Sequence, residues 1–162
     1  MSRLALCAGS FDPLTNGHVA IIGRGLRLFD RIHIAVSVNI RKTSLFTLDE
    51  RIAMVLEAFD HDPRVTASSF EGLLAKYASD LGAVAILRGL RGPSDFEYEL
   101  QMAHMNRHLT PELDTVFLPG EAAGSYISSS LVKEVATLGG DVSELVPTNV
   151  YAALRAKLAA RP

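Results

Sequence analysis

Apolar residues follow two alternating patterns along this chain: short continuous runs, and longer stretches in which they return every three or four positions. Continuous runs are typical of strands that are buried on both faces. The five runs lie at residues 4–8, 32–38, 65–68, 83–87 and 115–118. Because helical spacing fills the intervals, the pattern predicts the α/β class: a single-domain, Rossmann-like, doubly wound five-stranded parallel sheet with helices on both faces.

Apolar stripes and capping signals predict where the helices begin and end. The stripe of the first helix consists of Val19, Ile22, Leu26 and Phe29. The stripe of the third consists of Phe70, Leu73, Leu74, Tyr77 and Leu81. Capping boxes at 47–50 and 94–97 should open the second and fourth helices, and Gly82 should end the third. Ser128 or Ser129 should cap the fifth helix, and a last helix should start near Pro147.

Length and composition predict one domain. The chain has 162 residues, of which 48% are hydrophobic, and these are enough to fill a substantial core. We find no low-complexity segment, no repeat and no linker between two domains. We therefore expect residues 1–162 to form a single domain, with the C-terminal helices, roughly 128–160, packed on it.

Charge and cysteine content bear on partners and compartment. The formal net charge of -2 gives no overall attraction to nucleic acid or to an anionic membrane. No stretch is long and apolar enough to span a bilayer, and we see no signal peptide. The single cysteine, Cys7, has no intramolecular disulfide partner, which favours a reducing compartment. We expect a cytoplasmic protein that binds neither nucleic acid nor membrane.

Polar and glycine-rich segments follow four of the five predicted strands. They lie at residues 9–18, 39–46, 88–95 and 119–130. In a doubly wound sheet, ligands bind beyond the carboxyl ends of the strands, where the strand order reverses. We therefore expect these four segments to converge on one rim of the sheet.

The segment 15–18, Thr-Asn-Gly-His, places an imidazole on the first turn of the first helix. A helix N-terminus offers free backbone N–H groups and the positive end of the macrodipole, which together suit a phosphate. Gly9 and Ser10 lie in the loop just before it, where a glycine lets a ligand approach the backbone. His18 is thus a candidate donor to phosphoryl oxygens, although the same residues would also suit an ordinary strand-to-helix turn.

Two arginines follow the fourth predicted strand in the sequence Arg88-Gly89-Leu90-Arg91. Guanidinium groups make planar, bidentate contacts with phosphate. Glu99 on the next helix is suited either to a ribose hydroxyl or to an arginine. The alternative for the arginines is a surface pairing with the nearby carboxylates.

Two further segments carry phosphate-binding residue types. Lys42 lies in a polar loop after the second strand, where an ammonium group on a flexible stem suits a phosphate that shifts during reaction. The serines 128–130 place three hydroxyls at a helix N-terminus, which is more than capping requires. His104 and His108 lie four positions apart but lack a third ligand, so we predict no protein-held metal site.

Several of these segments resemble the nucleotidyltransferase superfamily that carries an (H/T)xGH motif, and within it the bacterial phosphopantetheine adenylyltransferases. The matching segments occur in family order and spacing over nearly the whole chain. They are residues 9–13, 15–18, 46–51, 88–91, 95–99, 101–107 and 127–134.

The resemblance implies transfer of AMP from ATP to 4′-phosphopantetheine, giving dephospho-coenzyme A and pyrophosphate. It also implies Mg²⁺ accompanying ATP, a homohexamer and coenzyme A as a feedback ligand. The positions that match the family's residues for the pantetheine substrate are Ser10, Lys42, Leu74 and Arg88. The positions that match its ATP-binding residues are Ser10, Phe11, His18, Gly89, Leu90, Arg91, Glu99, Gly124, Ser125, Tyr126, Ile127, Ser128, Ser129 and Ser130. His18 matches the position assigned to transition-state stabilisation.

The chain departs from the family pattern at three points. Ser10 replaces the usual threonine but keeps the hydroxyl. Cys7-Ala8 stands where Tyr-Pro or a similar pair is common, and Gly124 stands where an aromatic residue often lies. Stacking of an adenine on the side chain at position 124 is therefore not expected here.

The predicted chemistry needs no strong base, because the acceptor phosphate is already ionised near neutral pH. Catalysis then consists of aligning two polyanions and stabilising charge on the transferred group. We predict that His18, Lys42 and Arg91 are catalytic, with His18 and Lys42 near the α-phosphate and Arg91 near the β- and γ-phosphates. The alternatives are an adenylyl- or cytidylyltransferase with another phosphate acceptor, such as nicotinamide mononucleotide, and a non-catalytic coenzyme A or adenylate sensor. An RNA-binding domain is disfavoured by the net charge.

Overall fold

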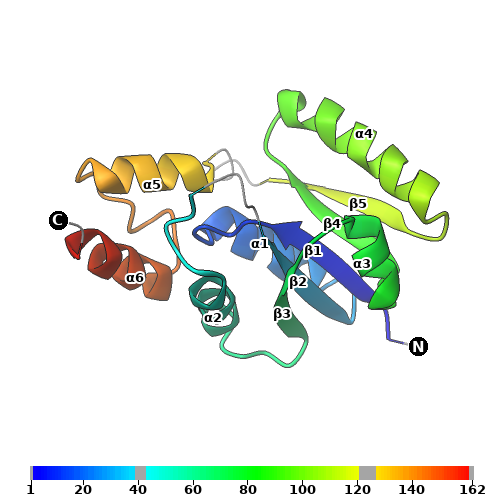
Figure 1. Cartoon of the computed structure of the whole chain (residues 1–162), viewed down its shortest axis with the longest axis horizontal. Helices are drawn as coiled ribbons and strands as arrows, with labels where there is room; N and C mark the ends of the chain where they lie inside the picture. The colour runs from blue at the N-terminus through cyan, green and yellow to red at the C-terminus, as the bar shows by residue number, and fades with distance from the viewer. Residues whose placement is uncertain (1, 39–42, 121–126, 161–162) are drawn as a thin grey trace.

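Five parallel strands and six helices make up the part of the chain that the structure, a computed structural model, describes: residues 2–38, 43–120 and 127–160 (Figure 1). In chain order they are β1 (Leu4–Gly9), α1 (Asn16–Gly25), β2 (Arg31–Ser37), α2 (Leu48–Ala58), β3 (Val65–Phe70), α3 (Leu74–Asp80), β4 (Ala85–Leu90), α4 (Pro93–Leu109), β5 (Asp114–Pro119), α5 (Ser129–Thr137) and α6 (Thr148–Ala159).

The strands lie in the order β3-β2-β1-β4-β5, and each neighbouring pair is parallel. Cys7 of β1 lies opposite Ile34 of β2, and Leu6 lies opposite Ile86 of β4. The chain therefore builds the sheet outward from β1 to β3 and begins again on the other side of β1 with β4. This confirms the predicted doubly wound parallel sheet, and its switch point lies between β1 and β4.

Each face of the sheet has its own apolar cluster. The larger cluster includes Ile22 of α1, Val55 of α2 and Val132 of α5, all fully buried. The smaller cluster packs Ala75 and Ala78 of α3 against the opposite face. Figure 1 shows α5 and α6 together at one end of the molecule and α4 at the other.

Most of the predicted helix ends are confirmed. Thr47 and Glu50 form the capping box of α2, with Thr47 N–H donating to the Glu50 carboxylate at 2.8 Å. Ser128 caps α5, and α6 begins directly after Pro147. Gly82 follows α3 with φ +68°, the left-handed conformation that glycine adopts most easily at a helix end.

Two predicted helix starts are wrong. Phe70 ends β3 instead of beginning the third helix, which starts at Leu74. The ring of Phe70 stacks on Tyr77 at 5.2 Å, so it reaches the helix from the strand, and this contact explains the misleading spacing. The predicted capping box at 94–97 is also wrong, because α4 begins at Pro93 after Gly92. Proline suits the first helical position because its missing N–H would have no intrahelical partner there.

Several predicted bounds also differ from the structure, and two of these differences bear on the core and the site. The first helix ends at Gly25, and Phe29 is buried from the turn that follows. The fourth strand runs to Leu90 instead of ending at residue 87, because its pairing with β5 continues through Arg88 and Gly89. Arg88 is therefore held within a strand and not in a loop.

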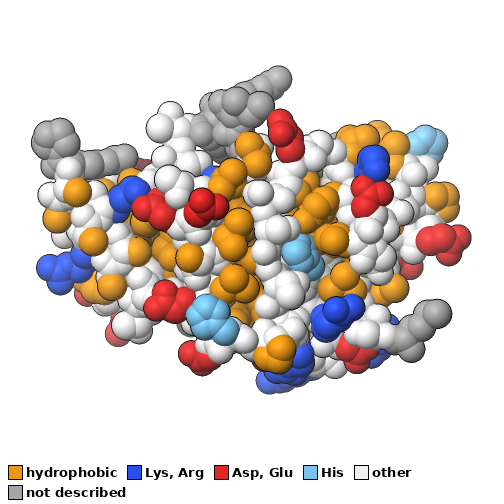
Figure 2. Space-filling model, turned by 60° about the horizontal axis from the view of Figure 1, so that its bottom comes forward, with side chains coloured by type: hydrophobic (Ala, Val, Ile, Leu, Met, Phe, Trp, Pro, Cys, Tyr) orange, Lys and Arg blue, Asp and Glu red, His pale blue; other side chains and the backbone are white. Residues whose placement is uncertain are grey.

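The surface carries charges of both signs. On the face in Figure 2, acidic and basic side chains are interspersed around apolar patches. In the described ranges, no helix has both the length and the apolar character needed to cross a bilayer.

Candidate active site

A cavity of about 360 Å³ opens at the carboxyl ends of β1 and β4, at the switch point of the sheet. Among the described residues, three chain segments line it: the end of β1 with the start of α1, the end of β4 with the start of α4, and Gly120 after β5 with the start of α5. These are three of the four segments that were predicted to converge. The sheet topology alone brings them together, since they are far apart in sequence.

His18 lies in the first turn of α1 and lines this cavity. Its Nδ1 accepts the backbone N–H of Thr15 at 3.0 Å, and the Thr15 hydroxyl accepts the His18 N–H, so the two residues form a capping box. Because Nδ1 is an acceptor, the neutral ring carries its proton on Nε2. Burial, together with the positive charges of Arg91 and Arg88, lowers the pKa of His18 to about 4. The imidazole is therefore a neutral donor near pH 7.

Phe11 supports the imidazole from the side. Its ring meets the His18 ring edge-on, with 5.0 Å between centroids, and it is 2% exposed. Phe11 holds a left-handed backbone with φ +46°, which is uncommon for a bulky residue. A Cβ on Gly9 would lie 3.3 Å from the Phe11 ring, so the glycine leaves room for it.

Arg88 is locked in place by two partners. Its Nε donates to Glu99 at 2.7 Å, its second terminal nitrogen donates to the other Glu99 oxygen, and Nη1 donates to the carbonyl of Ala8 at 2.7 Å. Burial opposes the charged form, but the hydrogen bond and charge of Glu99 outweigh it and raise the pKa of Arg88. Three of the five guanidinium N–H groups are used in this way, which leaves two for a ligand.

Arg91 is held more loosely. It pairs with Asp95, one turn into α4, at 3.0 Å, and its side chain is 48% exposed. Exposed pairs of this type are weak, so an anion in the cavity can compete with Asp95 for the guanidinium group.

The serine-rich segment contributes a helix N-terminus. Ser128 caps α5 by accepting the N–H of Leu131 at 3.1 Å, and the Ser129 hydroxyl donates to the carbonyl of Pro13 at 2.7 Å. Ser128, Ser129 and Ser130 all line the cavity. The positive end of α5 therefore faces the same space as His18 and the two arginines.

Cys7 lies on the wall of the cavity and is buried. Burial raises the pKa of its thiol to about 11, although the nearby Arg88 charge acts in the opposite direction. The sulfur is therefore a neutral wall atom and not a thiolate nucleophile near pH 7.

Most of the predicted site residues that the structure describes lie around the cavity. They are Ser10, Phe11, His18, Arg88, Gly89, Leu90, Arg91, Glu99, Ile127, Ser128, Ser129 and Ser130. Leu74 does not line it; it begins α3 and packs on the smaller apolar cluster. Lys42, Gly124, Ser125 and Tyr126 lie outside the described residues. The binding roles assigned to all of these residues stay predictions.

The pairing of Arg91 with Asp95 is the surface pairing that the sequence left open as an alternative. Sequence reasoning missed three other residues that organise this site. Buried Arg51 donates to the carbonyl of Ser10 at 2.8 Å. Asp12 and Lys133 form an ion pair at 2.6 Å. The sequence carried only a local signal for Lys133: it lies four positions after Ser129, on the same side of a predicted helix.

The site combines a neutral imidazole donor, two guanidinium groups and a helix N-terminus around one cavity. Both carboxylates on its lining, Asp95 and Glu99, are paired with arginines. Such a set of donors suits a ligand with several phosphate groups.

Comparisons with known proteins point the same way. The cytidylyltransferase-like family model matches residues 6–135. A protein named phosphopantetheine adenylyltransferase from Anaeromyxobacter sp. (strain K) is 52% identical over 162 residues, covering 100% of this chain and 99% of the relative. A protein of the same name from Nocardioides sp. is 51% identical over 156 residues, covering 96% of this chain and 98% of the relative.

A solved structure shares the fold. It is a bifunctional NMN adenylyltransferase/ADP ribose pyrophosphatase from Francisella tularensis, complexed with AMP and a manganese ion. It matches with a TM-score of 0.72 at 14% identity, over 99% of this chain and 50% of the bifunctional one. At that identity the likeness concerns the fold alone.

Proposed function

This chain belongs to the phosphopantetheine adenylyltransferases of the cytidylyltransferase-like family, and we propose that it transfers AMP from ATP to 4′-phosphopantetheine, giving dephospho-coenzyme A and pyrophosphate. The observation that carries this proposal is the cavity at the switch point, where His18, two arginines and the start of α5 face one space. The conclusion joins family membership to a site whose charges suit two phosphorylated substrates.

In the proposed reaction, an oxygen of the acceptor phosphate attacks the α-phosphorus of ATP in line. A new P–O bond forms to the acceptor as the bond to the β-phosphate oxygen breaks, and pyrophosphate leaves with that electron pair. His18 Nε2–H donates to an α-phosphate oxygen, where negative charge builds in the transition state. Its lowered pKa keeps the ring neutral and its proton in place.

We assign the two arginines to different substrates. Arg88, fixed by Glu99, would hold the acceptor phosphate together with Ser10. Arg91 and the serine-rich start of α5 would hold the β- and γ-phosphates. The looser hold of Asp95 on Arg91 favours this assignment, because Arg91 must follow pyrophosphate as it leaves.

The remaining assignments rest on the family. Lys42 would bridge the acceptor and the α-phosphate, and Leu74 would contact the pantetheine arm. Glu99, Gly89, Leu90 and Phe11 would lie along the nucleotide. The segment 124–130 would complete the ATP site.

We propose that Mg²⁺ enters as part of the MgATP substrate. In the described residues, no group of three or more histidine, cysteine, aspartate or glutamate side chains is arranged to hold a metal. The two carboxylates of the cavity are already neutralised by arginines. Metal binding without nucleotide should therefore be weak, which equilibrium dialysis would measure.

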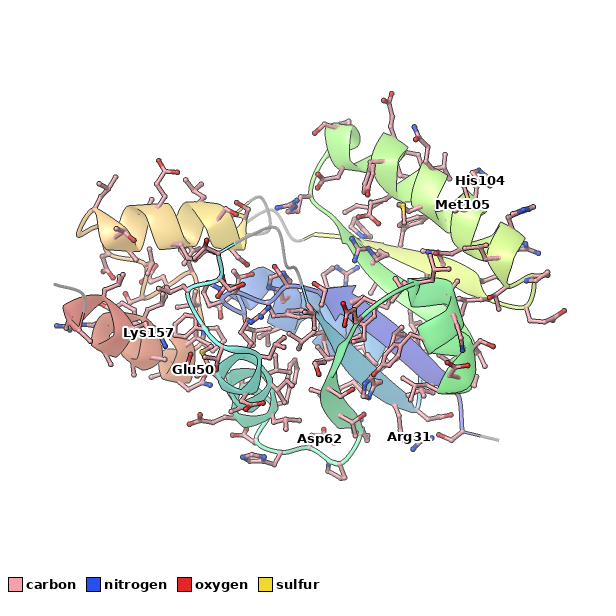
Figure 3. The ribbon with its side chains drawn as sticks, viewed as in Figure 1. Arg31, Glu50, Asp62, His104, Met105 and Lys157 are labelled. Carbon is pink, nitrogen blue, oxygen red and sulfur yellow. The ribbon has the colours of Figure 1, made fainter. Side chains whose placement is uncertain are left out.

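The proposed function also includes an oligomeric state, an inhibitor and a cellular compartment. We propose a cytoplasmic homohexamer that coenzyme A inhibits at the active site. Exposed apolar side chains on α4, such as Phe96, Met105 and Leu109, support self-association through this helix. Figure 3 shows Met105 on α4, and it is 54% exposed. Light scattering after size-exclusion chromatography would give the assembly state.

Pyrophosphate release tests the catalytic proposal. The protein is incubated with MgATP alone, and then with 4′-phosphopantetheine, nicotinamide mononucleotide or another phosphate acceptor. We expect release only with 4′-phosphopantetheine. Release with a different acceptor would reassign the substrate, and tight nucleotide binding with no release would indicate a sensor.

A further inference from the structure

The first loop of the cavity, residues 10–15, is held in part by an ion pair between Asp12, within the loop, and Lys133 of α5. Neither side chain lines the cavity itself. We infer that Asp12 and Lys133 form a positioning pair: their ion pair fixes the serine-rich start of α5 against this loop and so sets the ATP side of the site. The inference rests on the proposed function. The inference adds to the proposed function a pair of residues that influence the site only by positioning other residues.

Asp12 is a buried, charged anchor. It is 4% exposed, and its carboxylate accepts Leu45 N–H at 3.0 Å, Phe46 N–H at 2.9 Å and Lys133 Nζ at 2.6 Å. Burial raises its pKa, but the hydrogen bonds from Lys133 and the two N–H groups outweigh this and lower it overall. Asp12 is thus ionised at neutral pH, and an ionised carboxylate that lost Lys133 would leave a buried charge less well compensated.

Lys133 is one of two anchors that dock α5. Ser129 and Lys133 lie four positions apart, so they project from the same side of the helix. Ser129 donates to the carbonyl of Pro13 at 2.7 Å, and Lys133 bonds the neighbouring residue, Asp12. Two adjacent loop residues therefore hold two successive turns of α5.

This docking decides where the cavity serines lie. Ser128 and Ser130 flank Ser129 at the start of α5, and all three line the cavity. A displacement of only about 1 Å in a substrate-binding group can cost up to about 10²-fold in activity. Loss of the Lys133 ion pair should therefore displace the cavity serines and weaken ATP binding, although Lys133 itself touches no substrate.

Residues at and before α2 hold the loop 10–15 from the side opposite to α5. Leu45 and Phe46, bonded to Asp12, precede α2, and Arg51 of α2 donates to the carbonyl of Ser10. Ser10 would hold the acceptor phosphate in the proposed function, and it also matches an ATP-binding position of the family. Asp12 thus serves both sides of the site, whereas Lys133 serves only the ATP side.

This asymmetry gives a test on the full chain. In Lys133→Met we expect KM for ATP to rise about tenfold, while KM for 4′-phosphopantetheine stays within about twofold. In Asp12→Asn both KM values should rise. Lys133→Arg, which keeps the charge, should restore KM for ATP to within about threefold of wild type. The double variant should fall short of the product of the single effects, because the two residues act on each other.

Lys157 provides a matched control. Its Nζ lies 2.7 Å from Glu50, and its side chain is 33% exposed, against 26% for Lys133. Figure 3 shows this pair joining α6 to α2. Because the Glu50 side chain is 42% exposed and that of Asp12 only 5%, Lys157→Met should lower the melting temperature less than Lys133→Met, and it should leave KM for ATP unchanged.

Two results would overturn the inference: an unchanged KM for ATP in Lys133→Met, or an equal rise in Lys157→Met. Calorimetric ATP affinity is measured on the same variants, with about tenfold weaker binding expected for Lys133→Met. If wild-type protein released no pyrophosphate with 4′-phosphopantetheine, the proposed function would fail, and the ATP affinities would still decide the role of the pair.

Discussion

His18 shows how one side chain can serve structure and chemistry together. Its Nδ1 completes the capping box of α1 with Thr15, and this bond places the proton on Nε2, which is left for a ligand. Phe11 then limits the motion of the ring from one side. The orientation of the donor is therefore set before any substrate binds, which is what charge stabilisation in a transition state requires.

His18→Ala should slow kcat about 10²-fold, because the α-phosphate loses a preorganised donor. The change also removes half of a capping box, so a control with the same structural loss is needed. Glu50→Ala removes the corresponding half of the α2 box, together with the ion pair to Lys157, so it costs at least as much structure, and the residues of this box do not line the cavity. Steady-state kinetics should show a normal kcat for Glu50→Ala; a nearly normal kcat for His18→Ala would remove the imidazole from the chemistry.

The protonation of His18 can be observed directly. Burial comes first among the causes of its lowered pKa, followed by the charges of Arg91 and Arg88. Arg91→Met removes one positive charge, so protonation becomes easier and the pKa of His18 should rise. An NMR titration of the free protein, with the His18 signals assigned by their loss in His18→Ala, gives both values. Equal pKa values of His18 in wild type and Arg91→Met would show that the Arg91 charge does not affect the protonation of the imidazole.

At the scale of the element, helix starts organise this site. α1 and α5 both point their N-termini at the cavity, and each begins with a side-chain cap, Thr15 or Ser128. The sequence predicted both starts, that of α5 from its serine cap and that of α1 from the apolar stripe that follows His18, whereas the cap formed by Thr15 was not predicted. The sequence misplaced the start of α4, where Gly92 supplies no side chain and Pro93 marks the first turn instead.

Ser128→Ala should lower the free energy of unfolding by about 1 kcal/mol, because the Leu131 N–H loses its capping partner. Thr47→Ala removes the equivalent cap from α2, so a similar loss is expected there. Urea unfolding measures both losses. Only Ser128→Ala should also raise KM for ATP; an equal rise in both variants would mean that general loosening, and not the α5 cap, weakens nucleotide binding.

At the scale of the whole molecule, the sequence predicted the order of the elements and the rim where the site forms. Those features follow from apolar periodicity and from the rules of parallel sheets. The contacts that hold the rim together could not be predicted in this way. Asp12 and Lys133 are 121 positions apart, and only the finished packing of α5 brings them into contact. The end of β4 was missed for a related reason, because pairing with β5 keeps polar Arg88 in the strand.

The free energy of unfolding of the whole chain should fall on acidification, between the unfolded and folded pKa values of two half-buried histidines. His18 has a folded pKa of about 4 against 6.5 for the free side chain, and burial also lowers the pKa of His33. Below pH 6.5 the unfolded chain therefore binds more protons than the folded one, so the free energy of unfolding falls as the pH falls toward 4.

Urea unfolding at about pH 7 and about pH 5 measures this loss. His18→Gln cannot titrate, so its free energy of unfolding should change less between the two pH values than that of wild type. His33→Gln should act in the same direction. The pKa of Asp12 is lowered from an ordinary value of 3.8, so Asp12 contributes to the loss of stability mainly below this window. A loss of the same size in wild type and His18→Gln would mean that the imidazole is as easily protonated in the folded protein as in the unfolded chain, and the neutral donor assigned to the cavity would then be lost.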